Sequence, residues 1–313
     1  MNSPTRHASN RPGIAMIAVL WLIAILGMAS MVALRVISFD MQIATSKIHG
    51  SRARQFAEMG IAVGCNPVVK RTEPVLLHQF DEAAGGGFDV RIISEGSRFN
   101  INAILLGNDK DFIRDIFIGW GLELDAAQAV TDALADWVDA DDEANLNGAE
   151  KSWYEDLGRL NQPFNHPFYN LDEVNLVRGM EMVEAVRPDW RNWFTIWSGG
   201  KLDLNDAPAE LIAAATGCQL ELAQLIPETV CGPDGVRDTE DDAPFTDVNA
   251  ALDLIGLNTN MAPQLAGRLT VNDTTTRIES TGYTEGAKRR ITVIVRNRSG
   301  NPALLERIEE IIP

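Results

Sequence analysis

Residues Ile14 to Leu34 read IAMIAVLWLIAILGMASMVAL, a run of twenty-one residues without one charge. At about 1.5 Å per helical residue, this run reaches about 30 Å, which is the thickness of the hydrocarbon core of a bilayer. The stretch therefore predicts a membrane-spanning helix. A cleaved secretory signal fits less well, because the apolar core of such a signal is about 7 to 15 residues long and its small-residue cleavage site follows that core.

The charges beside the run predict its orientation. A short basic segment with Arg6 and Arg11 precedes it, and short basic flanks stay in the cytoplasm. Everything after Leu34 is therefore expected outside the cytoplasm. An ordinary single-span anchor satisfies the same pattern, so hydropathy and charge alone do not separate an anchor from a more specialised helix.

The helical pattern continues beyond the apolar run. No proline interrupts it before Asn66-Pro67, which ends it. The sequence thus predicts one helix of about fifty residues from Ile14, with its first half in the membrane and its second half packed on a domain. An apolar stripe at spacings of three and four residues is expected to make that contact. The stripe consists of Ile37, Met41, Ala44, Ile48, Phe56, Met59 and Val63.

Strand patterns stand at both ends of the remaining chain. Phe88 to Ile93 and Arg98 to Asn102 flank a turn and predict a hairpin, and two more strands are predicted at 277–281 and 289–297. Between them lie about 165 mainly helical residues, and a connection of that length is a folded insert rather than a loop. The predicted fold class is therefore α+β, with a long N-terminal helix, a small antiparallel sheet and a large mainly α-helical inserted domain. The helices predicted in the insert are 111–120, 125–139, 171–178, 207–216 and 247–255, and 304–312 is predicted as a short amphipathic turn.

Charge is distributed unevenly along the chain. Residues 1–70 carry a net charge of +5, so the rest of a chain with a net charge of −17 carries −22. Such an acidic surface repels phosphate backbones, which argues against nucleic acid as a partner, and it suits divalent cations. No enzyme is expected, because the four histidines are scattered and no serine stands in a G-x-S-x-G turn. No catalytic residue is assigned.

The chain has three cysteines, Cys65, Cys218 and Cys231. Cys218 and Cys231 flank a short segment that is expected outside the cytoplasm, where disulfides persist. They form either a disulfide or two buried thiols. Cys65 is expected as a small apolar residue on a helix face, and no Cys/His cluster supports a zinc site.

A first acidic cluster runs from Asp136 to Glu150. Oxygen-bearing side chains alternate along it as in a calcium loop of the EF-hand kind, but Ala144 stands where such a loop needs glycine. The cluster is therefore either an irregular calcium site or a set of solvated acids at a helix end. The candidate calcium ligands are Asp139, Asp141, Glu143 and Glu150.

A second acidic cluster is the glycine-bearing loop from Gly232 to Asp242. Five carboxylates within nine residues repel one another unless a hard cation lies among them, and Ca²⁺ accepts oxygens in flexible loops. The loop therefore predicts a calcium site, and the alternative is a mobile acidic surface loop. The candidate ligands are Asp234, Asp238, Glu240, Asp241 and Asp242.

Four stretches carry a resemblance to a known family. They are the Gly13/Ile14 junction, Arg98-Phe99-Asn100-Ile101-Asn102, Asp136-Trp137-Val138-Asp139-Ala140-Asp141-Asp142-Glu143 with Gly148-Ala149-Glu150, and Leu204-Asn205-Asp206-Ala207-Pro208-Ala209-Glu210. In this order they resemble the minor pseudopilin K family of type II secretion (general secretion pathway protein K). Most pilin-like subunits carry a Glu five residues past the cleaved glycine, whereas this chain carries Ala18, as the K branch does.

The resemblance implies a pilin-like architecture and a processed N-terminus. Residues 1–13 would be a leader, 14–103 the long helix and first strands of the core, 104–270 the inserted domain, and 271–313 the returning strands and tail. Prepilin peptidase would cut between Gly13 and Ile14 and methylate the new N-terminus. The chain would cross the bacterial inner membrane once, with its N-terminus in the cytoplasm and its C-terminal domain in the periplasm.

The resemblance also implies a role. A K-type minor pseudopilin caps the tip of the periplasmic pseudopilus, helps to start its assembly and supports export of folded proteins. Its implied partners are minor pseudopilins I, J and H, prepilin peptidase and secreted substrates. Two other classes of protein share the anchor and the acidic clusters, namely an anchored envelope binding protein and an anchored envelope hydrolase.

Overall fold

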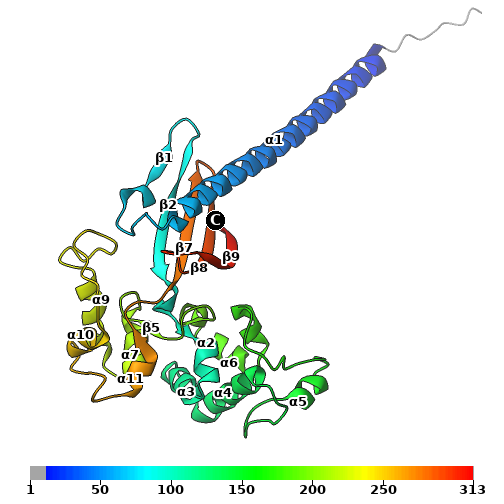
Figure 1. The fold of residues 1–313 in the computed structure, drawn as a ribbon. Helices are drawn as coiled ribbons and strands as arrows, with labels where there is room; N and C mark the ends of the chain where they lie inside the picture. The colour runs from blue at the N-terminus through cyan, green and yellow to red at the C-terminus, as the bar shows by residue number, and fades with distance from the viewer. Residues whose placement is uncertain (1–11, 313) are drawn as a thin grey trace, which may run out of the picture.

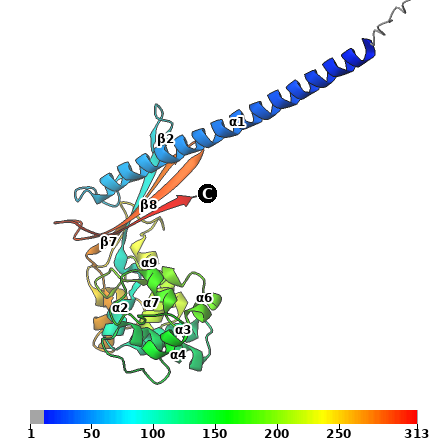
Figure 2. The same cartoon turned by 90° about the vertical axis from the view of Figure 1, so that its right-hand side faces the viewer.

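The structure, a computed structural model, describes residues 12–312. A long helix, α1 (Pro12–Cys65), lies with its C-terminal end on a five-stranded antiparallel sheet, and a helical insert hangs from one end of that sheet (Figures 1 and 2). The N-terminal half of α1 projects away from the insert. The predicted fold class is thereby confirmed. Residues 1–11, most of the predicted leader, lie outside the described residues.

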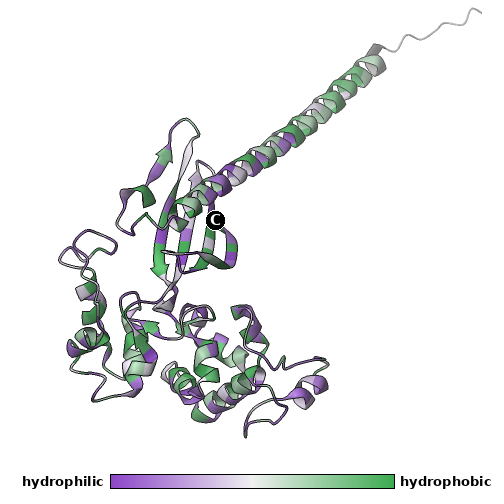
Figure 3. Cartoon of the chain, viewed as in Figure 1, coloured by the Kyte–Doolittle hydropathy of each residue, from purple (hydrophilic) through white to green (hydrophobic). Residues whose placement is uncertain are grey.

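The N-terminal half of α1 has no protein neighbour among the described residues. All side chains from Ala15 to Ile48 are exposed, and most of the first half of the helix is hydrophobic (Figure 3). By length and composition, α1 is long and apolar enough to cross a membrane. An exposed apolar helix of this length is stable in lipid, where its side chains are solvated and its backbone bonds are internal. The helix thus fits a single-pass membrane anchor.

The C-terminal part of α1 packs on the sheet through small residues. A Cβ on Gly60 would lie 2.1 Å from Ser280 Oγ, and a Cβ on Gly282 of the sheet would lie 2.0 Å from the carbonyl oxygen of Ala53. At these two positions the helix and the sheet therefore approach too closely for a side chain to fit between them. The buried residues recur at spacings of three and four and are Gly50, Ala53, Phe56, Ala57, Gly60, Ile61 and Gly64.

The apolar stripe predicted for this contact is mostly wrong. Phe56 is buried and Val63 half-buried, but Ile48 and Met59 are 54% and 53% exposed. Close approach between a helix and a sheet selects residues without bulk, and such residues leave little signal in a hydropathy pattern. Ile48 and Met59 consequently face away from the sheet, whereas Phe56 and Ile61 are buried beside the small residues.

The sheet contains two segments of the chain that are far apart in sequence. Its strands lie in the order β1, β2, β7, β8, β9, and every neighbouring pair is antiparallel. α1 packs across β2, β7 and β8 over a small core that includes Val90, Ile278 and Val293. The bounds are η1 Pro74–Leu76, β1 Gln79–Asp81, β2 Gly86–Ser94, β7 Thr275–Thr284, β8 Ala287–Arg296 and β9 Ala303–Ile312.

Two local predictions are wrong. Residues 95–97 form a short 3-10 helix instead of a hairpin turn, and the short strand after them pairs in parallel with residues 194–195. Asn100 explains the change, because its side chain accepts a hydrogen bond from the Ala103 N–H and so starts a helix at Ile101. The predicted turn at 304–312 is instead β9, the edge strand beside β8.

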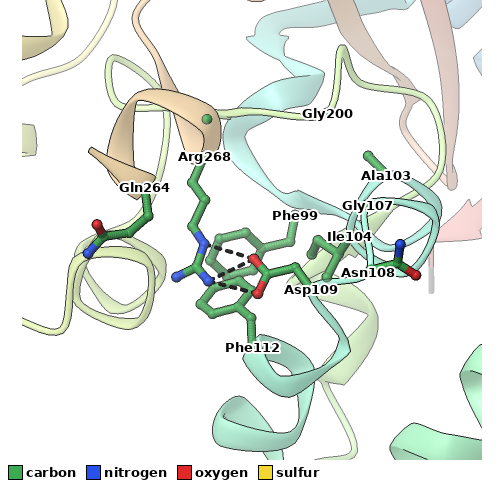
Figure 4. Close-up of a pocket in the computed structure, with 11 residues that line it drawn as sticks. Phe99, Ala103, Ile104, Gly107, Asn108, Asp109, Phe112, Gly200, Gln264 and Arg268 are labelled. Atoms are coloured by element: carbon green, nitrogen blue, oxygen red, sulfur yellow. Dashed lines mark hydrogen bonds and ion pairs between the residues drawn. The ribbon is translucent and has the colours of Figure 1, made fainter. Parts of the chain in front are cut away.

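The insert leaves the sheet after Ser94, returns at Thr275, and has its own hydrophobic core. Arg268 at the end of α11 (Gln264–Arg268) contacts the start of α3 (Lys110–Gly119), since the guanidinium binds the Asp109 carboxylate with both contacts at 2.9 Å and lies over the Phe112 ring (Figure 4). Its elements are η2 Glu95–Ser97, β3 Phe99–Asn100, α2 Ile101–Leu106, α3 Lys110–Gly119, α4 Leu124–Val138, α5 Lys151–Asp156, η3 Leu171–Leu176, α6 Met180–Val186, η4 Trp190–Asn192, β4 Phe194–Thr195, β5 Leu202–Asp203, α7 Ala209–Thr216, α8 Leu220–Ala223, α9 Leu225–Val230, α10 Val248–Asp253, α11 Gln264–Arg268 and β6 Leu269–Thr270.

Two buried carboxylates fasten the insert to the pilin-like part. Asp206 accepts hydrogen bonds from Arg71 at 2.8 and 2.9 Å, from Arg237, and from the Ser94 N–H at the end of β2. Burial alone would raise the pKa of Asp206, but the two arginines outweigh burial and hold that pKa below its usual value. Because these partners come from both parts of the chain, Asp206 joins the sheet to the insert.

Glu95 forms the second joint in the same way. Its side chain is 1% exposed and binds Arg98 at 2.6 Å and Arg277 of β7 at 3.1 Å. Thr195 donates a further hydrogen bond to it. Burial favours the neutral acid, but the charges of the two arginines lower the pKa of Glu95 overall.

Candidate functional site

The first acidic cluster forms where α4 ends and α5 begins. Asp139 is the C-cap of α4, and Glu150 is the residue before the first turn of α5. The loop between them turns back on itself, so that one ligand oxygen each from Asp139, Asp141 and Glu150 lie within 4.8 Å of one another. These are three of the four residues predicted for this site. Glu143, the fourth, lies on the exposed part of the loop and does not join them.

A fourth carboxylate completes the cluster. Asp136 is fully buried, one helical turn before Asp139, and its Oδ1 accepts hydrogen bonds from the backbone and side chain of Asn145. Its Oδ2 has no partner in the structure. Asp136 is not among the ligands predicted from the sequence. The spacing of three residues before Asp139 was the available signal, since it places both side chains on one helix face.

Buried acceptor oxygens without partners mark this cluster. Glu150 is 5% exposed and neither of its carboxylate oxygens has a hydrogen-bond partner, and Asp139 Oδ1 has none either. A buried carboxylate that lacks a donor must take up a proton or bind a cation. The donor set consists of carboxylate oxygens alone, which is the chemistry that Ca²⁺ prefers.

The pKa values of Asp139 and Glu150 reflect the same burial and the repulsion between neighbouring carboxylates. Burial, with the charges of Asp141 and Asp136, raises the pKa of Asp139 to about 6. Burial, with the charges of Asp136 and Asp139, raises the pKa of Glu150 to about 7. A divalent cation among these oxygens would reverse both effects, because metal ligands bind in the deprotonated state.

Gly148 allows the loop to close over the cluster. A Cβ at this position would lie 1.9 Å from Asp136 Oδ2, so no larger residue fits without moving the carboxylate. The loop is further held by Arg178, which donates to the Gly148 carbonyl at 2.9 Å, and by Lys110, which contacts both Asp132 and Asn145. The site is therefore built by the fold around it.

The second acidic loop is arranged differently. Asp238 pairs with Arg71 at 2.9 Å, Asp242 accepts from the Asp238 N–H, and Asp241 accepts from the Asp234 N–H. In the part of the chain that the structure describes, its predicted ligands, with Glu240 among them, do not converge as those of the first cluster do. Arg71, from outside the loop, pairs with Asp238, and Arg237, within the loop, pairs with Asp206.

The predicted disulfide is not formed in the structure. Cys65, Cys218 and Cys231 are all free and partly buried. Cys218 lies just after α7, where the Thr216 hydroxyl contacts its sulfur at 3.2 Å, and Cys231 caps the end of α9. The alternative considered from the sequence, two thiols in the packed insert, describes this arrangement.

Comparisons with known proteins show which family this chain resembles. Residues 97–188 match the family model described as type II secretion system (T2SS), protein K. The type II secretion system protein K of Pectobacterium carotovorum subsp. carotovorum is 30% identical over 108 residues, which cover 31% of this chain and 33% of that protein. The matched segment thus spans about a third of the length of that relative.

The fold extends the likeness over most of the chain. A chain of the crystal structure of the GspK-GspI-GspJ complex from the enterotoxigenic Escherichia coli type 2 secretion system superposes with a TM-score of 0.59. The superposition covers 87% of this chain and 98% of that chain, at 14% sequence identity. The family match, the curated relative and the fold together confirm the resemblance to type II secretion system protein K that the sequence predicted.

Proposed function

We propose that this protein is a minor pseudopilin of a type II secretion system that occupies the tip of the pseudopilus. The observation that carries the proposal is the combination of an exposed apolar anchor helix with a pilin-like sheet and a match to protein K in the insert. The anchor joins the helical bundle of a pilus, the sheet forms the subunit body, and the insert adds bulk that a repeating subunit would not accommodate.

Ala18 supports a terminal position. In pilin filaments, the Glu at this place pairs with the N-terminus of a neighbouring subunit, and an unpaired carboxylate in lipid is costly. A subunit at the tip has no neighbour above it to supply that partner. Alanine, which is exposed on α1 here, carries no such cost.

The proposal includes processing and membrane topology. Prepilin peptidase cuts after Gly13 and methylates Ile14, and the helix crosses the inner membrane with the sheet and insert in the periplasm. Mass spectrometry of the mature N-terminus tests this, with methylated Ile14 as the expected first residue. Gly13→Val should leave the leader attached, whereas Gly27→Val, at a position with open space around its Cβ, should be processed normally. An intact leader on the unaltered chain would refute the proposal.

The partners follow from the same role. The protein whose fold matches was crystallised with GspI and GspJ. We infer that this chain binds the corresponding minor pseudopilins, with H as a further one, through α1 and the pilin-like sheet. Exported proteins meet the tip through the insert. Copurification with tagged I and J subunits should succeed for the full chain and fail when α1 is replaced by an unrelated membrane helix.

We also propose that the first acidic cluster binds calcium. The unpartnered oxygens of Glu150 and Asp139 support a cation there, with Asp141 as the third converging carboxylate and the charge of Asp136 nearby. A cation that binds only the folded state stabilises it by about 4 kcal/mol at a thousandfold excess over its Kd.

Melting of the full chain in detergent tests the calcium proposal. Calcium should raise Tm relative to chelator, and Glu150→Gln should abolish that increase. Asp234→Asn, in the other acidic loop, is the matched control and should leave the increase unchanged. Equal Tm values with calcium and with chelator would rule the site out.

A further inference from the structure

A stack of three aromatic rings lies on the surface of the insert. The rings of Phe164 and His166 are 5.6 Å apart at 18°, and those of His166 and Tyr169 are 4.2 Å apart at 27°. His166 therefore lies between the other two rings. Phe164 is 41% exposed and Tyr169 is 69% exposed. The residues that carry the rings lie in the segment between α5 and η3.

The rings are held in place by the structure beneath them. Asn165 donates to the Asp141 carbonyl at 2.8 Å and to Asp142 Oδ1 at 3.2 Å, which ties the segment to the loop of the acidic cluster. Phe164 also meets the fully buried Trp137 ring edge-on at 5.2 Å. A surface aromatic group that is already ordered loses little conformational entropy when it binds a partner.

The stack borders a cavity whose charged residues are all acidic. The cavity has a volume of about 460 Å³, and its lining includes the three rings, Leu176, Asp172 and Glu173 without any Lys or Arg. Glu173 is occupied, because its oxygens accept from Trp137 Nε1 and from the Tyr169 N–H. Asp172 is 88% exposed, and Arg191, at 3.5 Å, is the cation that contacts it.

The hydrogen bond of His166 adds an acceptor to this surface. Its Nδ1 lies 2.8 Å from the Pro167 carbonyl oxygen, which can only accept, so Nδ1 carries the hydrogen. In the neutral ring, Nε2 is then an acceptor. The surface thus offers aromatic faces, a ring nitrogen acceptor and a carboxylate, and an arginine side chain complements all three, because its guanidinium stacks on rings and donates at its edge.

We propose that this aromatic surface binds an arginine side chain on an extended segment of another polypeptide. The proposal does not depend on the chain being a pseudopilin, since it rests on the stack and its cavity alone. The guanidinium lies on the exposed face of Tyr169 and donates toward Asp172. Acidic partners are disfavoured by the charge of the cavity, and an apolar side chain would offer no donor to His166 Nε2.

Fluorescence anisotropy with the full chain in detergent tests the proposal. The probe is a labelled Gly-Arg-Gly-Arg-Gly peptide, and the comparison peptide carries citrulline, the neutral isostere of arginine. The arginine peptide should bind at least fivefold more tightly than the citrulline peptide. Tyr169→Leu should weaken arginine binding at least fivefold, while Tyr169→Phe, which keeps the ring, should not change it.

Two comparisons separate this site from general attraction to an acidic protein. Neither Tyr169 variant alters the net charge, so nonspecific binding would be equal in both. Phe80→Ala removes another aromatic side chain, 59% exposed on β1, and should leave binding unchanged. Equal affinity of Tyr169→Leu and Tyr169→Phe, equal affinity for the two peptides, or no binding of the arginine peptide would each overturn the proposal.

Discussion

The contact between α1 and the sheet makes Gly282 the position where one methyl group should do the most damage. A Cβ at Gly282 would lie 2.0 Å from the Ala53 carbonyl oxygen and 2.3 Å from the Ala57 nitrogen, both backbone atoms of α1. Ordinary contacts of this kind are more than 1 Å longer, so Gly282→Ala must push the helix off the sheet. Overpacking of a core costs about 1–3 kcal/mol, and a clash with helix backbone belongs at the upper end of that range.

Hydrogen exchange of the full chain in detergent measures this cost locally. A loss of about 3 kcal/mol corresponds to roughly a hundredfold faster exchange of amides in β7 and β8. Amides of α4 should keep their rates, because the insert has a separate hydrophobic core. Gly286→Ala, in the turn between β7 and β8, is the control, since the nearest atoms to its Cβ lie 3.9 Å away. Unchanged exchange in β7 for Gly282→Ala would refute the close-contact argument.

Three further predictions concern the carboxylates. Asp206→Asn should destabilise the joint between sheet and insert by about 3–5 kcal/mol, because two arginines lose their charged partner. Limited proteolysis near residue 94 should then become faster. Gly148→Ala should displace Asp136 and abolish the increase of Tm on adding calcium. Without calcium, the pKa values of Asp139 and Glu150 are raised to about 6 and about 7, so the folded state favours their protonated forms. Tm should therefore rise as pH falls from 7 to 5. With saturating calcium, this rise should disappear.

The sequence predicts an element well when one physical requirement acts on residues that are close together in the chain. The uncharged run from Ile14 must satisfy lipid, and the β-branched residues of β7 and β8 favour strands, so the sequence predicts both features. The end of α4 and the start of α5 also bring Asp139, Asp141 and Glu150 together as expected. In each case, the residues that matter are near one another in the chain.

Predictions failed where the deciding partner is distant. The second acidic loop is balanced by Arg71, 167 residues before Asp238, and no local pattern announces that contact. The face of α1 on the sheet depends on Gly282, against which small residues of α1 pack, while Ile48 and Met59 stay exposed. At residues 98–102 the deciding contact is local instead, because a side-chain cap by Asn100 outweighs a strand-like alternation.

The two joints between the sheet and the insert fix the orientation of the insert relative to the sheet. Asp206 connects Arg71, which follows α1, to Arg237 in the second acidic loop, and Glu95 connects Arg277 of β7 to the start of the insert. Each carboxylate is buried and binds at least two partners, so each joint fixes an angle as well as a distance. Rotation of the insert about one joint would break the other. The Tyr169 stack on the insert is therefore held in a defined orientation relative to α1, and a pilus that advances through α1 would advance that surface with it.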